Sequence, residues 1–191
     1  KFCDYIHENR FIFAIHSKYI LSLPKRTSMI KRVIKNSIQA DYRREKVIVL
    51  LGARQVGKTT LLSELQEGAN KVLSLNCDNV DDVLLLESKT STELKYLLSS
   101  YDLVFIDEAQ RVKNIGLTLK MIGDLKLKTQ VVVTGSSSFD MANEVNEPAT
   151  GRLIEYNLYP FSLAELAADT SEREEKRLLE NRLIYGLYPE V

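Results

Sequence analysis

The chain has 191 residues, of which 45% are hydrophobic, so it can bury one substantial core. Its 26 basic residues balance 26 acidic ones, which excludes a strong overall field toward nucleic acid or membrane surfaces. No apolar run approaches the ~20 residues that span a bilayer, and two cysteines without a C-x-x-C pair favour a reducing compartment, so we expect a cytoplasmic protein.

Residues 1–28 are expected to be an N-terminal extension of uncertain origin, with the natural domain starting near Met29. The apolar run Phe11–Ile15 is too short for a signal peptide, and the acidic residues Asp4 and Glu8 precede it. Residues 24–28 have the composition of a linker.

A helix is expected from Met29 onward, because one helical stripe collects the apolar residues Ile30, Val33, Ile34, Ile38 and Tyr42. The basic residues Lys31, Arg32 and Lys35 lie mostly off this stripe. Residues 25–46 contain eight basic and two acidic side chains. This stretch is either a solvated basic face or a contact for nucleic acid or another partner.

The apolar run Val47–Leu51 predicts a buried strand, and residues 52–59 follow it directly with the sequence GARQVGKT. This segment matches the phosphate-binding pattern G-x-x-x-x-G-K-[ST] in full. A strand, a glycine-bearing loop and then a helix direct backbone N–H groups and a helix dipole at one point, which suits a nucleotide triphosphate. The predicted phosphate-binding residues here are Gly52, Ala53, Gln55, Val56, Gly57, Lys58, Thr59 and Thr60.

Each fixed position of the loop has a chemical reason. Gly52 and Gly57 let the backbone adopt unusual angles and pass close to phosphates. Lys58 supplies a point charge to the β- and γ-phosphates, and the Thr59 hydroxyl is placed to bind Mg²⁺. Arg54 lies in the variable part of the loop, where a solvated side chain is expected.

Strand and helix patterns alternate along the rest of the chain. The expected strands are Val47–Leu51, Lys71–Asn76, Tyr101–Asp107, Gln130–Thr134 and Leu153–Leu158. The expected helices between them are Lys58–Gln66, Asp81–Glu87, Ser91–Leu98, Ile115–Lys126 and a shorter one near Phe139–Val145. This alternation predicts an α/β fold with a parallel sheet covered on both faces.

The third strand ends in two adjacent carboxylates, Asp107 and Glu108. Asp107 is expected to support the Mg²⁺ site at the carboxyl end of the strand. Glu108 is expected to orient and deprotonate the water that attacks the γ-phosphate, which favours hydrolysis over a simple kinase. Gln110 either senses the γ-phosphate or makes a hydrogen bond within its loop.

The fourth strand ends in the hydroxyl cluster of residues 136–138. These serines either donate hydrogen bonds to the γ-phosphate and water or cap the next helix. Ser136 is the one assigned to the phosphate. Arg152, just before the fifth strand, is a candidate arginine finger for a neighbouring subunit's nucleotide, with a surface ion pair as the alternative.

Beyond Pro160 only helical patterns occur, at Ser162–Ala168 and Glu172–Tyr185, before the closing residues GLYPEV. We expect residues 29–160 to form the nucleotide-binding core and residues 161–191 to be the beginning of a helical lid, truncated inside a longer protein.

The ordered segments GARQVGKT, FIDEAQ, VVVTGSSS, TGR, YPFSLAE and GLYPEV resemble the AAA-type ATPases of bacteria and archaea that carry a poorly characterised C-terminal domain. The resemblance covers about residues 29–191. It implies a three-layer P-loop fold with strand order 5-1-4-3-2, ATP with Mg²⁺, and Ser136 as a first sensor. It also places Gly186 and Pro189 near the nucleotide, with a simple helix terminator as the alternative.

The resulting hypothesis is an ATP-binding, ATP-hydrolysing domain that moves its lid or a neighbouring domain, in a possible homo-oligomer. The alternatives are a slow nucleotide-dependent switch and, more remotely, a P-loop kinase. The preference for ATP over GTP comes from the resemblance alone, because the sequence contains no legible base-reading motif.

Overall fold

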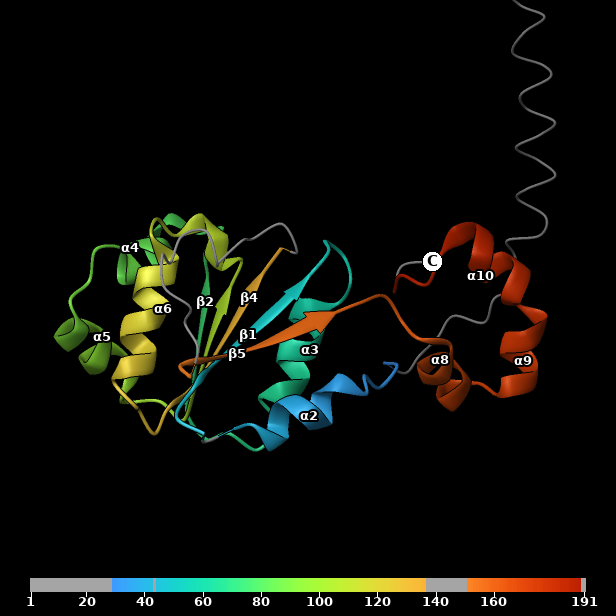
Figure 1. The fold of residues 1–191 in the computed structure, drawn as a ribbon, viewed down its shortest axis with the longest axis horizontal. Helices are drawn as coiled ribbons and strands as arrows, with labels where there is room; N and C mark the ends of the chain where they lie inside the picture. The colour runs from blue at the N-terminus through green and yellow to red at the C-terminus, as the bar shows by residue number, and fades with distance from the viewer. Residues whose placement is uncertain (1–28, 43, 137–150, 190–191) are drawn as a thin grey trace, which may run out of the picture. The chain divides into compact units, whose positions relative to one another are not determined.

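The computed structural model describes residues 29–42, 44–136 and 151–189 (Figure 1). The helices and strands of the described residues belong to one unit, Lys31–Val191. In chain order they are α2 (Ile34–Ala40), β1 (Val47–Gly52), α3 (Lys58–Leu65), β2 (Val72–Asn76), α4 (Val80–Leu86), α5 (Ser91–Leu98), β3 (Leu103–Asp107), the short 3-10 helix η2 (Ala109–Arg111), α6 (Ile115–Asp124), β4 (Gln130–Gly135), β5 (Leu153–Leu158), α8 (Leu163–Asp169), α9 (Glu172–Arg177) and α10 (Leu179–Tyr185). The helix expected near Phe139–Val145 lies outside the described residues.

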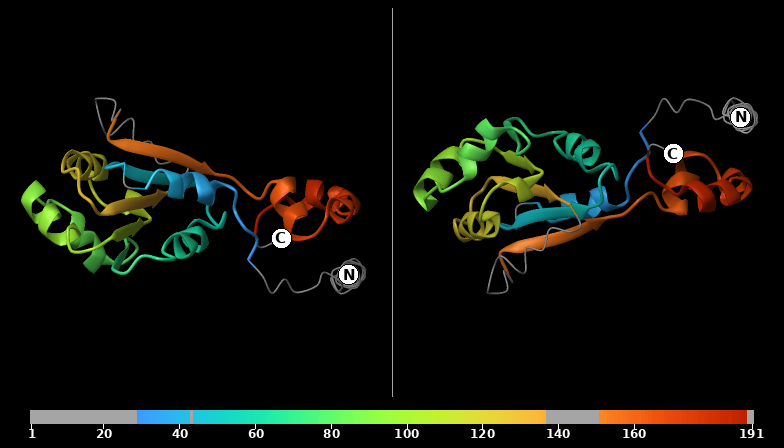
Figure 2. Two further views of the ribbon diagram at one scale, coloured as in Figure 1. Left: turned by 90° about the horizontal axis from the view of Figure 1, so that it is seen from below. Right: turned by 90° about the horizontal axis from the view of Figure 1, so that it is seen from above.

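The five strands form one parallel sheet in the order β2-β3-β4-β1-β5 (Figures 1 and 2). This is the predicted order 5-1-4-3-2 counted from the opposite edge, so the expectation is confirmed. Every residue of β1 and β4 is buried, because a central strand of a parallel sheet is covered on both faces.

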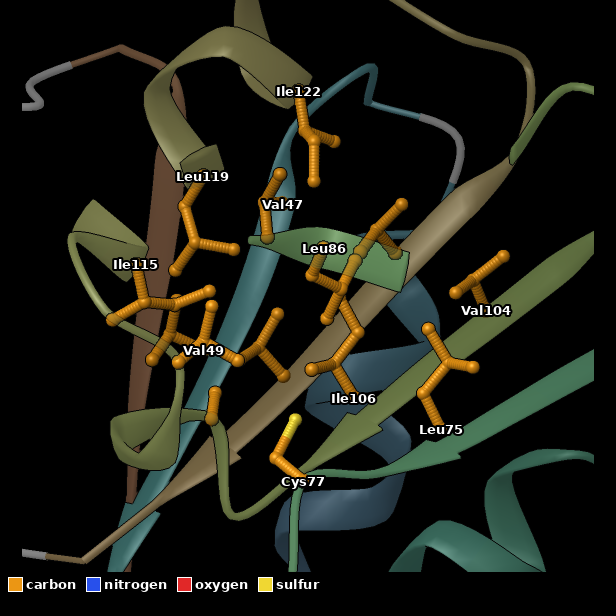
Figure 3. Packing of buried hydrophobic residues seen from close by; sticks show 14 of the residues in the cluster. Val47, Val49, Leu75, Cys77, Leu86, Val104, Ile106, Ile115, Leu119 and Ile122 are labelled. Atoms are coloured by element: carbon orange, nitrogen blue, oxygen red, sulfur yellow. The ribbon is translucent and has the colours of Figure 1, made fainter. Parts of the chain in front are cut away.

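Alternate strand residues divide the core into two layers, one on each face of the sheet. In β1, Val47 and Val49 join a cluster that packs against α4, α5 and α6, and Figure 3 shows this packing. Ile48 and Leu50 join a second cluster, with residues of α2 and α3. The chain therefore has the three-layer αβα arrangement that the sequence predicts.

The first helix is shorter than its apolar stripe indicates. α2 begins at Ile34, while Met29 and Val33 are 64% and 68% exposed. Only Ile38 is fully buried, with Ile34 and Tyr42 packed partly against the same core. A period-based prediction extends a helix through every matching residue, whereas burial begins only where the chain reaches the sheet.

The basic stretch of residues 25–46, which includes α2, is not a solvated face throughout. Arg32 is only 9% exposed and lies 3.4 Å from the Glu165 carboxylate. Lys35 forms ion pairs with Glu64 and Glu67 at 3.3 and 3.1 Å. The expectation of a solvated basic face is therefore wrong for Arg32, which the Glu165 carboxylate, distant in sequence, binds internally. Lys35 stays partly exposed in its ion pairs, and a contact of this stretch with nucleic acid or another partner stays a prediction.

Beyond β5, the chain forms α8, α9 and α10. α8 begins with a capping box, in which the Ser162 and Glu165 side chains each bind the other's backbone N–H. The expected single helix Glu172–Tyr185 is instead two helices that meet at Leu178. Among the described residues, no helix combines the length and apolar character needed to cross a membrane.

Leu119→Ala should reduce the free energy of unfolding by about 2–5 kcal/mol, because Leu119 on α6 is fully buried and its truncation leaves a cavity. Urea denaturation measures the change. Leu117→Ala on the same helix is the matched control, since Leu117 is 56% exposed, and should change stability by less than about 0.5 kcal/mol. Equal losses in the two variants would contradict the assignment of the buried helix face.

Candidate functional site

The site is built where the neighbouring strands β3, β4 and β1 end. Their carboxyl ends share one edge of the sheet because all three strands are parallel. Asp107 is the last residue of β3, Gly52 the last of β1, and Ser136 follows β4 directly. The register pairs Leu51 with Gly135, so Ser136 lies beside the start of the loop.

Residues 52–59 leave this edge as a tight loop that leads into α3. Gly52 is required sterically, because a Cβ there would lie 2.7 Å from the Leu158 carbonyl oxygen. Gly57 precedes α3 with φ +97° and Gln55 has φ +61°, both in the left-handed region. These turns bring the loop to the N-terminus of α3, where unpaired backbone N–H groups can bind an anion.

Lys58 is buried, and its Nζ donates to the carbonyl oxygens of Gly52 and Ala53, each at 3.0 Å. The ammonium group thus lies across the mouth of the loop. Thr60 and Arg54 are exposed, and Val56 is fully buried beneath the loop. The loop therefore presents backbone donors and one cation, which are suited to phosphate groups.

The Thr59 hydroxyl donates to Oδ2 of Asp107 at 3.0 Å. The structure therefore brings together the two residues that were predicted as magnesium ligands, although they are 48 positions apart in the chain. A hydroxyl beside a carboxylate is an all-oxygen donor set, and it fits Mg²⁺, which takes one or two protein ligands together with phosphate oxygens and water.

Thr134 is a site residue that the sequence prediction missed. Its buried hydroxyl donates to Oδ1 of Asp107 and accepts the backbone N–H of Glu108 at 3.1 Å. One threonine on β4 therefore holds both acidic residues at the end of β3. Its signal in the sequence is a hydroxyl inside an otherwise apolar strand, where a satisfied partner is required.

Glu108 has φ +53° and ψ +42°, a conformation that is uncommon for a residue with a side chain. Its backbone N–H donates to Oδ1 of Asp107 at 3.2 Å as well as to Thr134, and these bonds stabilise the turn. The Gln110 amide donates to the Glu108 carboxylate. Of the two expectations for Gln110, the structure contains the hydrogen bond within the loop.

Cys77 follows β2 behind the carboxylates, and its backbone N–H donates to the Asp107 carbonyl at 2.9 Å. Burial, together with the nearby Asp82 and Asp107 carboxylates, raises the pKa of the Cys77 thiol to about 12. A thiol with a raised pKa lacks the thiolate character that nucleophilic cysteines have.

Arg152 does not join the other predicted site residues. It lies at the amino-terminal edge of the sheet, where its carbonyl accepts the Val47 N–H at 3.0 Å and its guanidinium pairs with Asp124. β1 separates this edge from the phosphate loop by roughly 17 Å, at about 3.3 Å per residue. The surface ion pair that was the alternative is thus present, and a role on another subunit's nucleotide stays a prediction.

The C-terminal turn returns to the loop. The ring of Pro189 lies 3.7 Å from the position that a Cβ on Gly57 would occupy. Gly186 ends α10 with φ +89° and ψ −173°, which is essentially restricted to glycine. The Leu187 carbonyl accepts the Phe161 N–H at 2.9 Å and ties the turn to the start of α8. The structure therefore places Pro189 beside the predicted phosphate-binding residues.

The model of the AAA domain family matches residues 44–167 of this chain. The chain is 25% identical over 160 residues to an uncharacterised protein of Haemophilus influenzae, covering 75% of this chain and 39% of that protein. It is 25% identical over 174 residues to an uncharacterised protein of Methanocaldococcus jannaschii, covering 85% and 34%. The chain thus spans little more than a third of the length of these curated relatives.

Two solved structures have a similar fold. One is the Walker-type ATPase of Pyrococcus abyssi, with a TM-score of 0.53 and 16% identity, covering 83% of this chain and 65% of that one. The other is a signal transduction ATPase with numerous domains and a tetratricopeptide repeat sensor from Pyrococcus horikoshii, with a TM-score of 0.50 and 14% identity, covering 85% and 29%. Both likenesses concern the fold, which is that of P-loop NTPases.

Thr134→Val should lower the free energy of unfolding by about 1–3 kcal/mol, because the nearly isosteric side chain leaves the Glu108 N–H and Asp107 Oδ1 without their shared partner. Urea denaturation measures the loss. Thr134→Ser is the matched control, since it keeps the hydroxyl, and should recover more than half of it. A serine variant as unstable as the valine variant would contradict the assignment of the loss to the hydroxyl.

Proposed function

The chain belongs to the AAA domain family, and from this premise we propose that it binds ATP with Mg²⁺ and hydrolyses it to ADP and phosphate. The observation that supports the proposal best is the linked set Thr59, Asp107, Thr134 and Glu108, which joins the phosphate loop to a base for water. Binding alone needs only the loop, whereas hydrolysis also needs a carboxylate held beside it.

The phosphate chain would be bound by the loop backbone between Gly52 and Thr60 and by Lys58. The Lys58 ammonium group would exchange its bonds to the Gly52 and Ala53 carbonyls for bonds to β- and γ-phosphate oxygens. Thr59 and Asp107 would hold Mg²⁺, which when bound neutralises charge that develops on the phosphates.

Glu108 would accept a proton from the attacking water, and its left-handed backbone angles place it in the turn that directly follows β3. The Gln110 amide orients that carboxylate in the present structure. Ser136, at the neighbouring strand end, would donate a hydrogen bond to the γ-phosphate. Pro189 would contact the nucleotide from the side of the C-terminal turn.

The division of labour within the chain follows the same proposal. Residues 29–160 would form the nucleotide-binding core, and residues 161–191 would begin a lid that moves when the γ-phosphate is lost. Because the curated relatives are about three times as long as the matched region, the lid would transmit this movement to further domains. Arg152 would act only in an oligomer, on a neighbouring subunit's nucleotide.

A slow nucleotide-dependent switch is the second candidate, and the Gln110–Glu108 bond favours it. While it persists, this bond occupies a carboxylate oxygen that the attacking water would need. If ATP binding does not release Glu108, turnover stays slow and the bound state persists.

Glu108→Gln should retain ATP affinity within about threefold and reduce the rate of phosphate release by roughly 10²–10⁴-fold, because an amide cannot accept the proton. Steady-state phosphate release and fluorescent-nucleotide titration measure the two quantities. Glu155→Gln, at an exposed position of β5, is the matched control and should behave as wild type. Tight ATP binding without phosphate release in the wild type would favour the switch, and transfer to an acceptor would indicate a kinase.

Lys58→Ala should weaken ATP binding at least tenfold. The Lys58 ammonium group, which donates to the Gly52 and Ala53 carbonyls of the loop, is the cation that would bind the phosphates. Lys95→Ala on the exposed face of α5 controls for the loss of one positive charge. Unchanged affinity in Lys58→Ala would contradict the assignment of the loop.

A further inference from the structure

Arg32 lies ahead of α2 and contacts three other parts of the chain. Its Nη1 donates to the carbonyl oxygen of Val56 at 3.5 Å, within the phosphate loop. Its Nη2 donates to the carbonyl of Tyr159, just after β5. Its guanidinium carbon lies 4.5 Å from the centre of the Phe161 ring, and Nε lies 3.4 Å from the Glu165 carboxylate on α8.

Glu165 is itself held from two sides. Its Oε1 accepts the backbone N–H of Val33 at 2.9 Å, next to Arg32 in the chain. Its Oε2 accepts the backbone N–H of Ser162 at 2.9 Å in the capping box that starts α8. Arg32 and Glu165 are each less than one-tenth exposed. The first turn of α8 is therefore joined by charge to the segment that also reaches the phosphate loop.

The contact with Val56 affects the loop through the geometry of the peptide unit. In a trans peptide the C=O of one residue and the N–H of the next point in opposite directions, and the described backbone contains no cis bond. Because Arg32 binds the Val56 carbonyl, it fixes the Gly57 N–H toward the opposite side. That N–H is one of the donors that the loop offers to a phosphate.

A second connection links the start of α8 to the phosphate loop through the C-terminal turn. Phe161, which stacks under the guanidinium, donates its N–H to Leu187, and the ring of Pro189 approaches Gly57. Arg32 thus reaches the loop at Val56, and the C-terminal turn reaches it at the next residue, Gly57.

We propose that Arg32 is a positioning residue that fastens α8 to the phosphate loop and orients the Gly57 N–H, so that phosphate binding and the position of α8 are coupled. The nucleotide half of this inference rests on the proposed function, whereas the attachment of α8 does not. The ligand whose binding is coupled to the position of α8 is the triphosphate group of a nucleotide.

The test compares Arg32→Gln, Glu165→Gln and the double variant with wild type. Arg44→Gln is the matched control, because Arg44 also pairs with a carboxylate but is 61% exposed. Hydrogen exchange without nucleotide should be at least tenfold faster in α8 and residues 186–188 of Arg32→Gln, with α6 unchanged. Unchanged α6 exchange also shows that the variant is folded.

ATP affinity supplies the second measurement. Arg32→Gln should bind ATP roughly tenfold more weakly, since one charge-assisted hydrogen bond is lost. Wild-type exchange in α8 should slow on ATP addition, and this slowing should vanish in both single variants. The double variant should bind within twofold of the weaker single variant, because both changes break one connection. Arg32→Lys keeps the positive charge but lacks the planar guanidinium group with its several N–H donors. It should recover part of the ATP affinity.

The inference would be overturned if Arg32→Gln had the same α8 exchange rate and ATP affinity as the wild type. It would also be overturned if the losses of ATP affinity in the two single variants multiplied in the double variant. If Arg32→Gln proves unfolded, the same readouts in Glu165→Gln and Arg32→Lys decide it by the same criteria. Wild-type protein that fails to bind ATP would overturn the proposed function and the phosphate half of the inference, while fast α8 exchange in Arg32→Gln would still support the attachment.

Discussion

The hydrogen bonds of the Asp107 carboxylate are the interactions on which the arrangement of the site depends. One oxygen accepts from Thr59 at the start of α3, and the other accepts from Thr134 on β4 and from the Glu108 N–H. A single side chain thus joins three elements at the carboxyl edge of the sheet. Parallel pairing makes this possible, because it brings the ends of β1, β3 and β4 together.

Two residues with left-handed backbone angles lie at the same edge. Gln55 and Glu108 both have left-handed backbone angles, which cost residues with side chains about 1–3 kcal/mol each. Such conformations persist only where surrounding structure stabilises them. The fully buried strands β1 and β4 and the bonds from Thr134 supply that stabilisation, so the rigid core holds the turn that presents Glu108.

Arg32 shows how a charge can be retained inside the protein. Burial lowers its pKa from the usual value, and the Glu165 and Glu64 carboxylates oppose that shift. A buried ion pair contributes little net stability compared with apolar residues, yet loss of either partner is costly. Such a pair is better suited to holding two segments in one relative position than to strengthening the core. This is the property that coupling between α8 and the phosphate loop requires.

Local pattern and chemical type are sufficient to predict the sheet and the residues of the loop from Gly52 to Thr59, and the resemblance adds the strand order. The roles of Thr134 and Arg32 and the location of Arg152 become apparent only in the folded chain. In the sequence, Thr134 is only one residue of a buried strand. Its partners become apparent when β3 pairs with β4. The sequence suggests a surface cation at Arg32, whereas the structure pairs Arg32 with Glu165, 133 positions later in the chain. Arg152 directly precedes β5, which pairs with β1. It therefore lies at the amino-terminal end of β1, opposite the end that leads into the loop. The physical reason is that burial and ion pairing depend on partners distant along the chain, which no periodicity records.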